Sequence, residues 1–581
     1  MLKTKIICTL GPAVEDEQIM RELMKCGMNV ARMNFSHGSK QERLKYIATI
    51  KKLREELRIP LPLLLDTKGP EIRLGTFAEG SVSLSEGDEF TLVSQEIIGN
   101  KKEVTVSYKE LYKDVTVGQH ILIDDGLVDL IVSKTGPEGI RCTVKNSGVI
   151  GDRKGVNVPD ANINMPSMTE QDEQDILFGI EQGFDFIALS FVRKADDVRQ
   201  VKRLLTRHGG EQIKVIAKIE SKQGVENIGS ILRYADGIMV ARGDLGVEMP
   251  VENVPPVQKS LIRRSTMMGK PVIIATQMLD SMIRNPRPTR AEANDVAGAV
   301  FDGASCIMLS GETAAGKYPL ESIKTMVRIA EAAEASMNYW ERFGSFSFDP
   351  ASTISNAISH ATCTVAMELN AAAIIPVTKS GSTARMISRF RPQAPIIAST
   401  PDEKIWRQLA LSWGVYPIRV SEQNNVEDLF AISIKTALEA GLVEQGDTIV
   451  LTGGAPVGYS GVTNILKVEI AGDDLIKVKG VTGGHATGRV SIADNQDDVA
   501  NMEAVGILVT KNIQQKQLHM MRHADAIIVE DDDNEGKAET IGLMLDIPVV
   551  VGAANATSLL KSGTIVTVDA DKGLIRMERS I

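Results

Sequence analysis

Apolar, β-branched runs of strand length recur along the first 345 residues, and each ends in polar positions before a stretch of helical periodicity. The eight runs are KIICTLGP, NVARMNFSHG, LPLLLDTKGP, DFIALSFVRK, KVIAKIES, GIMVARGDLG, PVIIATQM and CIMLSGET. Eight consecutive βα units predict a closed (β/α)8 barrel, in which function lies at the carboxyl ends of the strands.

A different pattern separates the third and fourth units. Between about residues 70 and 169, stretches such as SVSLSEGDEFTLVS and HILIDDGLVDLIVS alternate apolar and polar positions between glycine-rich turns. This alternation predicts an inserted β-barrel domain, so that the catalytic barrel comprises residues 1–69 and 170–345. A domain inserted above a barrel mouth is a candidate lid, because its closure excludes water from the chemistry.

Two further domains are expected after the barrel. Residues 351–472 carry the strand-like runs AAAIIPVT, PIIAST, VYPIRV, DTIVLTGG and ILKVEI between helical segments, which predicts a doubly wound α/β domain. Residues 475–581 return to a glycine-rich, β-rich pattern and form an extra C-terminal domain. The predicted fold class is therefore α/β, with a (β/α)8 barrel, the inserted β domain, the doubly wound domain and the C-terminal domain.

Composition narrows the functional class. A chain of 581 residues with 43% hydrophobic and 24% charged residues is typical of a globular protein of about four domains. We expect no membrane partner, because no apolar run reaches about 20 residues and the N-terminal segment has the pattern of a first strand. A net charge of -10 without a sustained basic block argues against nucleic-acid binding. Five scattered cysteines without a CxxC pair favour reduced thiols and a cytoplasmic location.

The segment VIAKIESKQG places opposite charges at the end of an apolar strand. Strand alternation directs Ile216, Lys218 and Glu220 to one face and Val215 with its alternate neighbours to the other. A buried Lys218 requires a carboxylate, a metal or an anionic ligand beside it, since burying an unpaired charge is costly. Taken alone, these ten residues fit a solvated edge strand with a surface ion pair better.

The other predicted strand ends change that balance. They carry Arg32 and Asn34, Asp66 and Thr67, Ser190, Asp244, Thr276, and Ser310 with Glu312. Glu220 and Asp244 end consecutive strands, and two carboxylates with water and substrate oxygens suit a hard cation such as Mg²⁺. Arg32 offers a planar fork for phosphate or carboxylate. A purely structural ring of salt bridges is the alternative, and the number of contributing strands favours a metal-dependent enzyme that acts on anions.

Six segments resemble the signature sequences of the pyruvate kinase family, in the family's order. They are ARMNFSHG, LLLDTKGPEIRLG, VIAKIESKQGV, ARGDLGVE, IATQMLDSM and MLSGETAAGKYP. The resemblance covers about residues 1–470. It implies transfer of the phosphoryl group of phosphoenolpyruvate to ADP in the last step of glycolysis, with Mg²⁺ or Mn²⁺ and K⁺ as cofactors, in a homotetramer.

The resemblance also implies roles for single residues. Lys218 stabilises charge on the phosphoryl group and the developing enolate, and Thr276 lies near the face where the enolate is protonated. The substrate-binding residues are Arg32, Gly243, Asp244 and Thr276; the nucleotide-binding residues are Arg73 and Lys154; the divalent-metal ligands are Glu220 and Asp244; the K⁺ ligands are Asn34, Ser36, Asp66 and Thr67. Glu71 matches an acidic residue typical of K⁺-requiring members.

The segment VTKSGSTARMISRF is a candidate effector site. A strand leads into a predicted helix that starts near Ser382, and hydroxyls, free amides and a lysine at a helix N-terminus suit a phosphate. An ordinary Ser/Thr helix cap is the alternative. The segment matches the family's effector-phosphate loop through Thr378, Lys379, Ser380, Ser382 and Thr383. The later loop TGGAPVGYSGVTN has no Lys or Arg for a second phosphate, so we expect a monophosphate effector.

The extra domain resembles the swivelling phosphohistidine domain of enzymes that use phosphoenolpyruvate, which implies a C-terminal α/β domain of the swivelling type. In that pattern a histidine lies about nine residues before the DIP triplet, and here the position is Lys537. We therefore expect no phosphoryl carrier in residues 475–581.

The residues alone leave two other functions possible. One is a Mg²⁺-dependent barrel lyase or mutase that acts through an enolate, which would share the carboxylate pair and the basic groups. The other is a non-enzymatic sensor of nucleotides or sugar phosphates built on an inactive barrel.

Overall fold

The structure is a computed structural model that describes residues 1–159, 161–344, 353–444, 447–455, 463–472, 475–493, 506–514 and 517–578. Its chain divides into two compact units, one of Met1–Cys363, Pro376–Val426 and Thr452–Ile465, the other of Thr364–Ile375, Glu427–Leu451 and Leu466–Ile581. None of the described helices is long and apolar enough to span a membrane.

Eight parallel strands close into a barrel in the order β1-β16-β15-β14-β13-β12-β3-β2. They are β1 (Lys5–Thr9), β2 (Met28–Asn34), β3 (Leu63–Asp66), β12 (Phe186–Leu189), β13 (Lys214–Ile219), β14 (Gly237–Ala241), β15 (Val272–Ala275) and β16 (Cys306–Leu309). Seven strands lie within the predicted runs and β2 begins one residue before its run, so the predicted barrel is confirmed.

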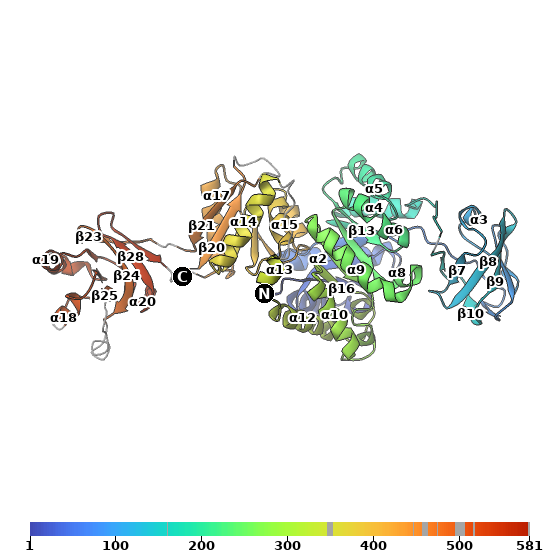
Figure 1. Cartoon of the computed structure of the whole chain (residues 1–581), viewed down its shortest axis with the longest axis horizontal. Helices are drawn as coiled ribbons and strands as arrows, with labels where there is room; N and C mark the ends of the chain where they lie inside the picture. The colour runs from blue at the N-terminus through green and yellow to red at the C-terminus, as the bar shows by residue number, and fades with distance from the viewer. Residues whose placement is uncertain are drawn as a thin grey trace. The chain divides into compact units, whose positions relative to one another are not determined.

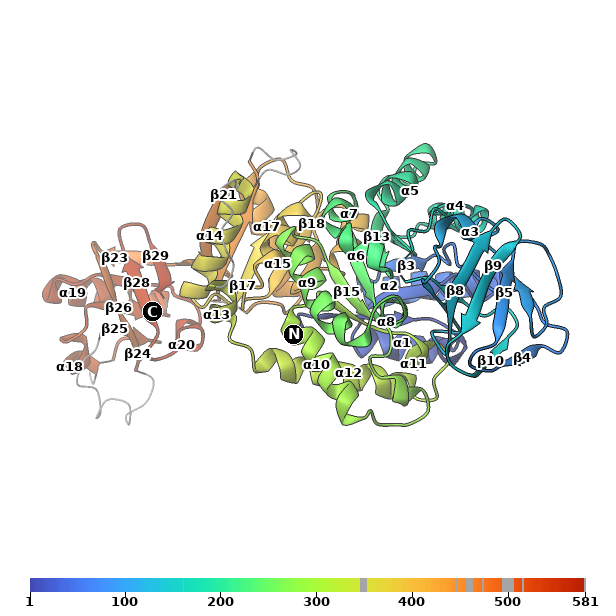
Figure 2. The same cartoon turned by 45° about the vertical axis from the view of Figure 1, so that its right-hand side comes forward.

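Helices follow the strands and cover the outside of the barrel (Figures 1 and 2). They include α1 (Glu17–Lys25), α2 (Lys40–Leu57), α4 (Glu170–Gln182), α5 (Ala195–Arg207), α7 (Ile228–Tyr234), α9 (Val254–Met267), α10 (Arg290–Asp302) and α12 (Pro319–Ala335). Short helices α6 (Lys222–Glu226), α8 (Arg242–Glu248) and α11 (Gly311–Ala314) lie in the loops after β13, β14 and β16.

Strand β13 shows how the apolar pattern produces two cores. Ile216 packs in the barrel interior with the inward side chains of other strands. Val215 and Ala217 pack in the outer core between the strands and the helices. Strands buried on both faces read as continuous apolar runs, which is why the eight runs were recognisable. The alternation predicted for this strand is confirmed, and it directs Lys218 into the barrel.

The inserted segment forms its own β domain with its own apolar core. Strands β7 (His120–Ile123), β8 (Val128–Gly136) and β9 (Gly139–Val144) pair with β5 (Glu89–Val93), β6 (Glu103–Thr105) and β11 (Val156–Asn157) in a six-stranded sheet of order β11-β7-β8-β9-β5-β6. Strands β4 (Ser81–Leu84) and β10 (Gly148–Gly151) form a separate pair. The predicted inserted β domain is confirmed.

The predicted α/β domain is a five-stranded sheet of order β19-β18-β17-β20-β21. Its strands are β17 (Ala373–Pro376), β18 (Ile396–Thr400), β19 (Val415–Arg419), β20 (Thr448–Gly453) and β21 (Ile465–Ile470), and its helices include α14 (Ile354–Glu368), α15 (Ser382–Arg389), α16 (Glu403–Leu409) and α17 (Val426–Glu439).

The C-terminal segment forms an eight-stranded sheet of order β22-β29-β28-β24-β25-β26-β27-β23. Its strands are β22 (Leu475–Lys477), β23 (Lys479–Thr482), β24 (His485–Ile492), β25 (Ile507–Thr510), β26 (Ala526–Val529), β27 (Val549–Val551), β28 (Ile565–Asp569) and β29 (Leu574–Glu578). Helices α18 (Leu518–Met521), α19 (Glu535–Leu545) and α20 (Ala556–Leu559) complete the expected α/β domain.

A buried ion pair joins α16 to the amino-terminal side of the barrel. Arg407 Nε lies 2.9 Å from Asp185 Oδ1, and the Asp185 side chain is fully buried. The other carboxylate oxygen of Asp185 accepts a hydrogen bond from the backbone N–H of Leu63 at 3.0 Å. Burial raises the pKa of Asp185, and Arg407 opposes that rise. The carboxylate is stable there because both of its oxygens are satisfied.

We predict that Arg407→Met destabilises the fold by about 3–5 kcal/mol, because it leaves the Asp185 charge buried without a cation. Arg419→Met is the matched control, since Arg419 contacts Glu403 at 3.4 Å on the surface and such pairs contribute about 0–1 kcal/mol. Thermal unfolding of the two variants checks the prediction. Equal midpoints for both variants would contradict it.

Candidate active site

Lys218 lies at the centre of a buried charge cluster at the barrel mouth. Its Nζ is 3.0 Å from Asp66 Oδ1 and 3.0 Å from Glu220 Oε1, and it donates a hydrogen bond to Ser190 Oγ at 2.7 Å. Asp66 and Glu220 are both nearly inaccessible. The pair in VIAKIESKQG is therefore not on an edge strand, as those ten residues alone suggested. It is a buried pair supported by two further strands.

Arg32 completes the cluster from β2. Its Nε contacts Asp66 Oδ2 at 2.7 Å, and its Nη1 donates to Thr9 Oγ1 at 2.7 Å. Asp66 on β3 is thus held between Arg32 on the adjacent strand β2 and Lys218 on β13, which β12 separates from β3. Thr9 and Ser190 are positioning residues to which the sequence assigned no role, because an isolated hydroxyl at a strand end carries no distinctive signal.

The cluster favours the charged forms of Lys218 and Asp66. Burial lowers the pKa of Lys218, but the carboxylates of Asp66 and Glu220 outweigh it and raise that pKa above its usual value. Burial raises the pKa of Asp66, and the opposing effect of Lys218 and Arg32 lowers it overall. Lys218 is therefore a fixed positive charge at neutral pH, suited to stabilising anionic chemistry.

Asp244 is the carboxylate that lacks such compensation. Burial raises its pKa to about 7, and the nearby negative charge of Glu220 adds to the rise. A cation between the two carboxylates would relieve both effects. Among the described residues no cluster of three or more His, Cys, Asp and Glu side chains could hold a metal. A two-carboxylate site fits a hard divalent ion, which completes its shell with water and substrate oxygens.

The turn after β15 places the Thr276 hydroxyl next to this carboxylate segment. Thr276 and Gln277 have positive φ angles of 70° and 53°, a conformation that costs a non-glycine residue about 1–2 kcal/mol. Thr276 Oγ1 accepts a hydrogen bond from the backbone N–H of Gly243 at 3.0 Å. The sequence-predicted residues Gly243, Asp244 and Thr276 are thus brought together from two adjacent strands.

Arg242 holds that turn and was not identified from the sequence. Its Nη2 donates to the carbonyl oxygen of Thr276 at 2.7 Å, and its Nη1 contacts Asp295 on α10 at 2.6 Å. Its position directly before Gly243 and Asp244 was the available signal. By contrast, the Glu312 carboxylate holds the local backbone, because it accepts hydrogen bonds from the backbone N–H groups of Leu279 and Ser310.

The predicted K⁺ ligands converge in part. Asn34 and Asp66 are register partners on β2 and β3, and the Asn34 side-chain oxygen accepts from the Ser36 N–H at 3.0 Å. Thr67 Oγ1 accepts from the Ser190 N–H at 3.1 Å. Glu71 contacts Arg73 at 2.7 Å. Both acidic groups of this region therefore already have cationic partners.

A cavity of about 300 Å³ lies between the barrel mouth and the inserted domain. Arg73, Lys154 and Asp244 are among its lining residues. Lys154 contacts Asp124 at 2.9 Å and Arg73 contacts Glu71, so both predicted nucleotide-binding cations are held by carboxylates at the cavity wall. The inserted domain thus contributes charge to a space that reaches Asp244, one of the two predicted metal ligands.

The predicted effector loop is a tight turn before α15. Gly381 has φ 76°, and its N–H donates to Thr378 Oγ1 at 3.0 Å. Thr383 Oγ1 lies 2.9 Å from Thr463 Oγ1, which brings the end of the later loop alongside. Lys379 forms an exposed pair with Glu422 at 3.3 Å. Residues 456–462 of the later loop lie outside the described residues.

Lys537 lies exposed in the first turn of α19, at the position where the swivelling-domain pattern carries histidine. His485 begins β24, and His523 follows α18. Neither occupies the α19 position.

Comparison with known families assigns each part of the chain. Residues 1–323 match the family model of the pyruvate kinase barrel domain, residues 356–469 match the pyruvate kinase alpha/beta domain, and residues 502–573 match the mobile domain of PEP-utilising enzymes.

Curated relatives extend over the same regions. Pyruvate kinase of Geobacillus stearothermophilus is 46% identical and covers 99% of this chain and 98% of its own length. Pyruvate kinase of Clostridium acetobutylicum is 50% identical over 471 residues, 81% of this chain and 100% of its own. A solved pyruvate kinase of Cryptosporidium parvum superposes with a TM-score of 0.78 at 37% identity, over 81% of this chain and 96% of that one. The chain belongs to the pyruvate kinase family.

Proposed function

We propose that the chain transfers the phosphoryl group of phosphoenolpyruvate to ADP, giving ATP and pyruvate. The observation that carries this proposal is Lys218, a buried, fixed cation 3.0 Å from both Asp66 and Glu220 at the barrel mouth. Family membership supports the phosphotransferase hypothesis and gives no support to the lyase or mutase alternative. The intact charge cluster argues against a non-enzymatic barrel.

Lys218 and Arg32 would bind the anionic phosphate of the substrate, because they are the cations that line the mouth at its centre. Lys218 would also stabilise the negative charge that develops on the enolate oxygen as the phosphoryl group leaves, and Asp66 would keep it protonated throughout. Thr276 would orient a proton donor to the enolate carbon; the support is its hydroxyl, which accepts from the Gly243 N–H, and the turn that Arg242 holds.

Glu220 and Asp244 would hold the divalent cation, Mg²⁺ or Mn²⁺. When bound, this ion neutralises charge on substrate oxygens. Its fit rests on the raised pKa of Asp244, which reflects burial and the nearby charge of Glu220, and which Lys218 offsets only in part. K⁺ would bind at Asn34, Ser36, Asp66 and Thr67; the support is the pairing of Asn34 with Asp66 across neighbouring strands. The pyruvate kinase family implies a divalent metal and K⁺ in general.

Arg73 and Lys154 would bind the phosphates of ADP. Both line the cavity that Asp244 also lines, and each is held by an acidic neighbour that a polyphosphate would replace. The inserted domain would therefore act as a lid whose closure completes the nucleotide site.

We also propose a cytoplasmic homotetramer, which rests on family membership, and a C-terminal domain without a catalytic role. For the latter, the exposed Lys537 cannot replace a phosphohistidine. The Clostridium acetobutylicum relative matches 471 residues over its full length, about the extent of the barrel and α/β domains here.

Lys218→Met should lower kcat by several powers of ten while phosphoenolpyruvate still binds, because the lost charge acts mainly in the transition state. Lys259→Met is a suitable control, since Lys259 is an exposed lysine that pairs with Asp302 on the barrel's outer surface. Steady-state assay of pyruvate formation measures both variants. A Lys218→Met enzyme with more than about a tenth of the wild-type kcat, a difference of about 1.4 kcal/mol, would disprove the assignment.

Divalent-metal affinity should fall as the pH is lowered through about 7, because the raised pKa of Asp244 means that protons compete with the metal there. Deprotonation above that pH frees the ligand, so binding strengthens with rising pH, by about tenfold per unit below pH 7. Titration of Mn²⁺ into the substrate-free enzyme between pH 6 and 8 measures the effect. Asp244→Asn should bind weakly at every pH, and a wild-type affinity that is constant over this range would refute the prediction.

A monophosphate such as a nucleoside monophosphate or a pentose phosphate should activate the enzyme, and fructose 1,6-bisphosphate should have little effect, because the later loop has no cation for a second phosphate. Lys379→Met should abolish the activation. Lys435→Met should not, since Lys435 is an exposed lysine of α17 that pairs with Glu439 of the same helix, away from the effector loop. Each compound is titrated at subsaturating phosphoenolpyruvate. Strong activation by the bisphosphate alone would exclude this interpretation.

A further inference from the structure

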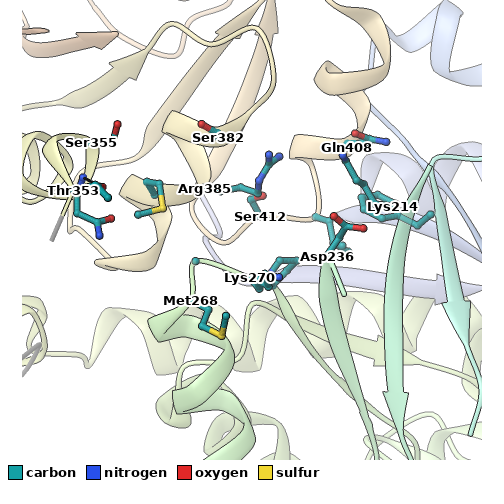
Figure 3. A pocket seen from close by; sticks show the side chains of 16 residues that line it. Lys214, Asp236, Met268, Lys270, Thr353, Ser355, Ser382, Arg385, Gln408 and Ser412 are labelled. Atoms are coloured by element: carbon teal, nitrogen blue, oxygen red, sulfur yellow. Dashed lines mark hydrogen bonds between the residues drawn. The ribbon is translucent and has the colours of Figure 1, made fainter. Parts of the chain in front are cut away.

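A second cavity, of about 460 Å³, lies at the opposite end of the barrel from the catalytic cluster. Its walls come from the amino-terminal ends of β12 to β15, from the start of α14, and from the barrel-facing side of α15 (Figure 3). Its volume is in the range of small-molecule sites. It shares Ser382 with the predicted effector loop and no other residue of that set.

Three cations converge on this cavity from three separate elements. Lys214 begins β13, Lys270 lies two residues before the start of β15, and Arg385 extends from α15 (Figure 3). The one acidic residue in the lining is Asp236, and it already contacts Lys202 at 3.0 Å. The cavity therefore carries a marked excess of positive charge.

The charge excess is unfavourable without an anion. Burial lowers the pKa of Lys214, Lys270 and Arg385 below their usual values, and Asp236 opposes that effect for all three. The positive charge of Arg385 lowers the pKa of both lysines further. Asp236 is thus the one carboxylate near four cations, the fourth being Lys202. A bound anion would stabilise the charged form of each cation.

Two of the three cations are already oriented by the protein. Lys270 Nζ donates to the carbonyl oxygens of Ala235, at 2.6 Å, and of Leu232, at the end of α7. Arg385 Nη2 donates to the carbonyl oxygen of Ser380 at 2.9 Å. Carbonyl groups hold these side chains without neutralising them. Lys214 forms no hydrogen bond or ion pair through its ammonium group with any described residue, so it is available to a ligand.

The rest of the lining combines apolar residues, among them Phe186, Met268 and Leu411, with neutral polar ones. Hydroxyl and amide side chains of Thr353, Asn356, Ser382, Gln408 and Ser412 occupy the wall beside the cations. In Figure 3, Thr353 and Ser355 lie at the end of the cavity away from Lys214. Neutral hydrogen-bonding groups of this kind suit the hydroxyl groups of a ligand rather than a second anionic group.

From this arrangement we propose that the cavity is a second anion site, which binds a small phosphate monoester that bears hydroxyl groups. Its phosphate lies among Lys214, Lys270 and Arg385, and its hydroxyl-bearing part extends toward Thr353 and Ser382. Such a ligand contacts the amino-terminal ends of β13, β14 and β15, the three strands whose opposite ends lead into Glu220, Asp244 and Thr276. The site is separate from the effector loop, because its cations are not those of the loop.

Calorimetric titration of ribose 5-phosphate into the full-length chain tests the proposal. All proteins carry Lys379→Met, which removes the cation of the effector loop. In this background we expect binding that Lys214→Gln weakens at least tenfold and that Lys214→Arg retains within about threefold. Lys324→Gln is the matched control, because Lys324 is an exposed lysine of α12, and it should bind like the parent. Unchanged binding by Lys214→Gln, or no binding in the parent, would overturn the proposal.

A second measurement needs no substitution at the site. Limited acetylation of the wild-type chain, read by mass spectrometry, compares the reactivity of Lys214 and Lys324 with and without ribose 5-phosphate. Protection of Lys214 and not of Lys324 supports the site, and equal reactivity of Lys214 in both conditions overturns it. A parallel sample with inorganic phosphate tests whether the hydroxyl-bearing part of the ligand contributes to binding. The proposal requires that phosphate alone protects Lys214 less than ribose 5-phosphate does.

Discussion

The barrel mouth depends on one constraint, that a charge buried in a protein needs an opposite charge within contact distance. Lys218 enters the barrel from a strand that is otherwise apolar, and Asp66 and Glu220 meet it at 3.0 Å from two sides. Arg32 balances the second oxygen of Asp66. Removal of any member leaves an uncompensated charge, so the cluster also ties β2, β3 and β13 to one register.

Asp244 differs from this balanced set in a way that suits function. Burial and the negative charge of Glu220 raise the pKa of Asp244 to about 7, and the positive charge of Lys218 offsets that rise only in part. A site that is incomplete without a cation binds one only when the carboxylates are free of protons. The turn at Thr276 also depends on its surroundings. Thr276 and Gln277 have positive φ angles that non-glycine residues disfavour, and Arg242, paired with Asp295, holds the turn through the Thr276 carbonyl oxygen.

The two ends of the barrel use charge differently. At the carboxyl end, Lys218 and Arg32 are matched by Asp66 and Glu220, and only Asp244 is incompletely compensated. At the amino-terminal end, Asp185 and Arg407 are matched, whereas Lys214, Lys270 and Arg385 exceed their one acidic partner. A parallel barrel separates these ends by the length of its strands, so one fold can hold a catalytic centre and a separate anion site without direct interference.

Much of the fold and of the catalytic centre followed from the sequence, because both are encoded by local patterns. Eight apolar runs predict eight strands, strand alternation places Ile216 and Lys218 on one face, and parallel closure gathers the strand ends that carry Glu220 and Asp244. Other features depend on segments that are distant in the chain. Arg242 reads as a surface arginine until Asp295 and Thr276 surround it, and Arg407 lies 222 residues from Asp185. Lys214 reads as a solvated lysine at a strand start, since only the packing of α15 against the barrel encloses it with Arg385. Local patterns determine which faces are buried, but the partners of a buried charge are decided by tertiary packing.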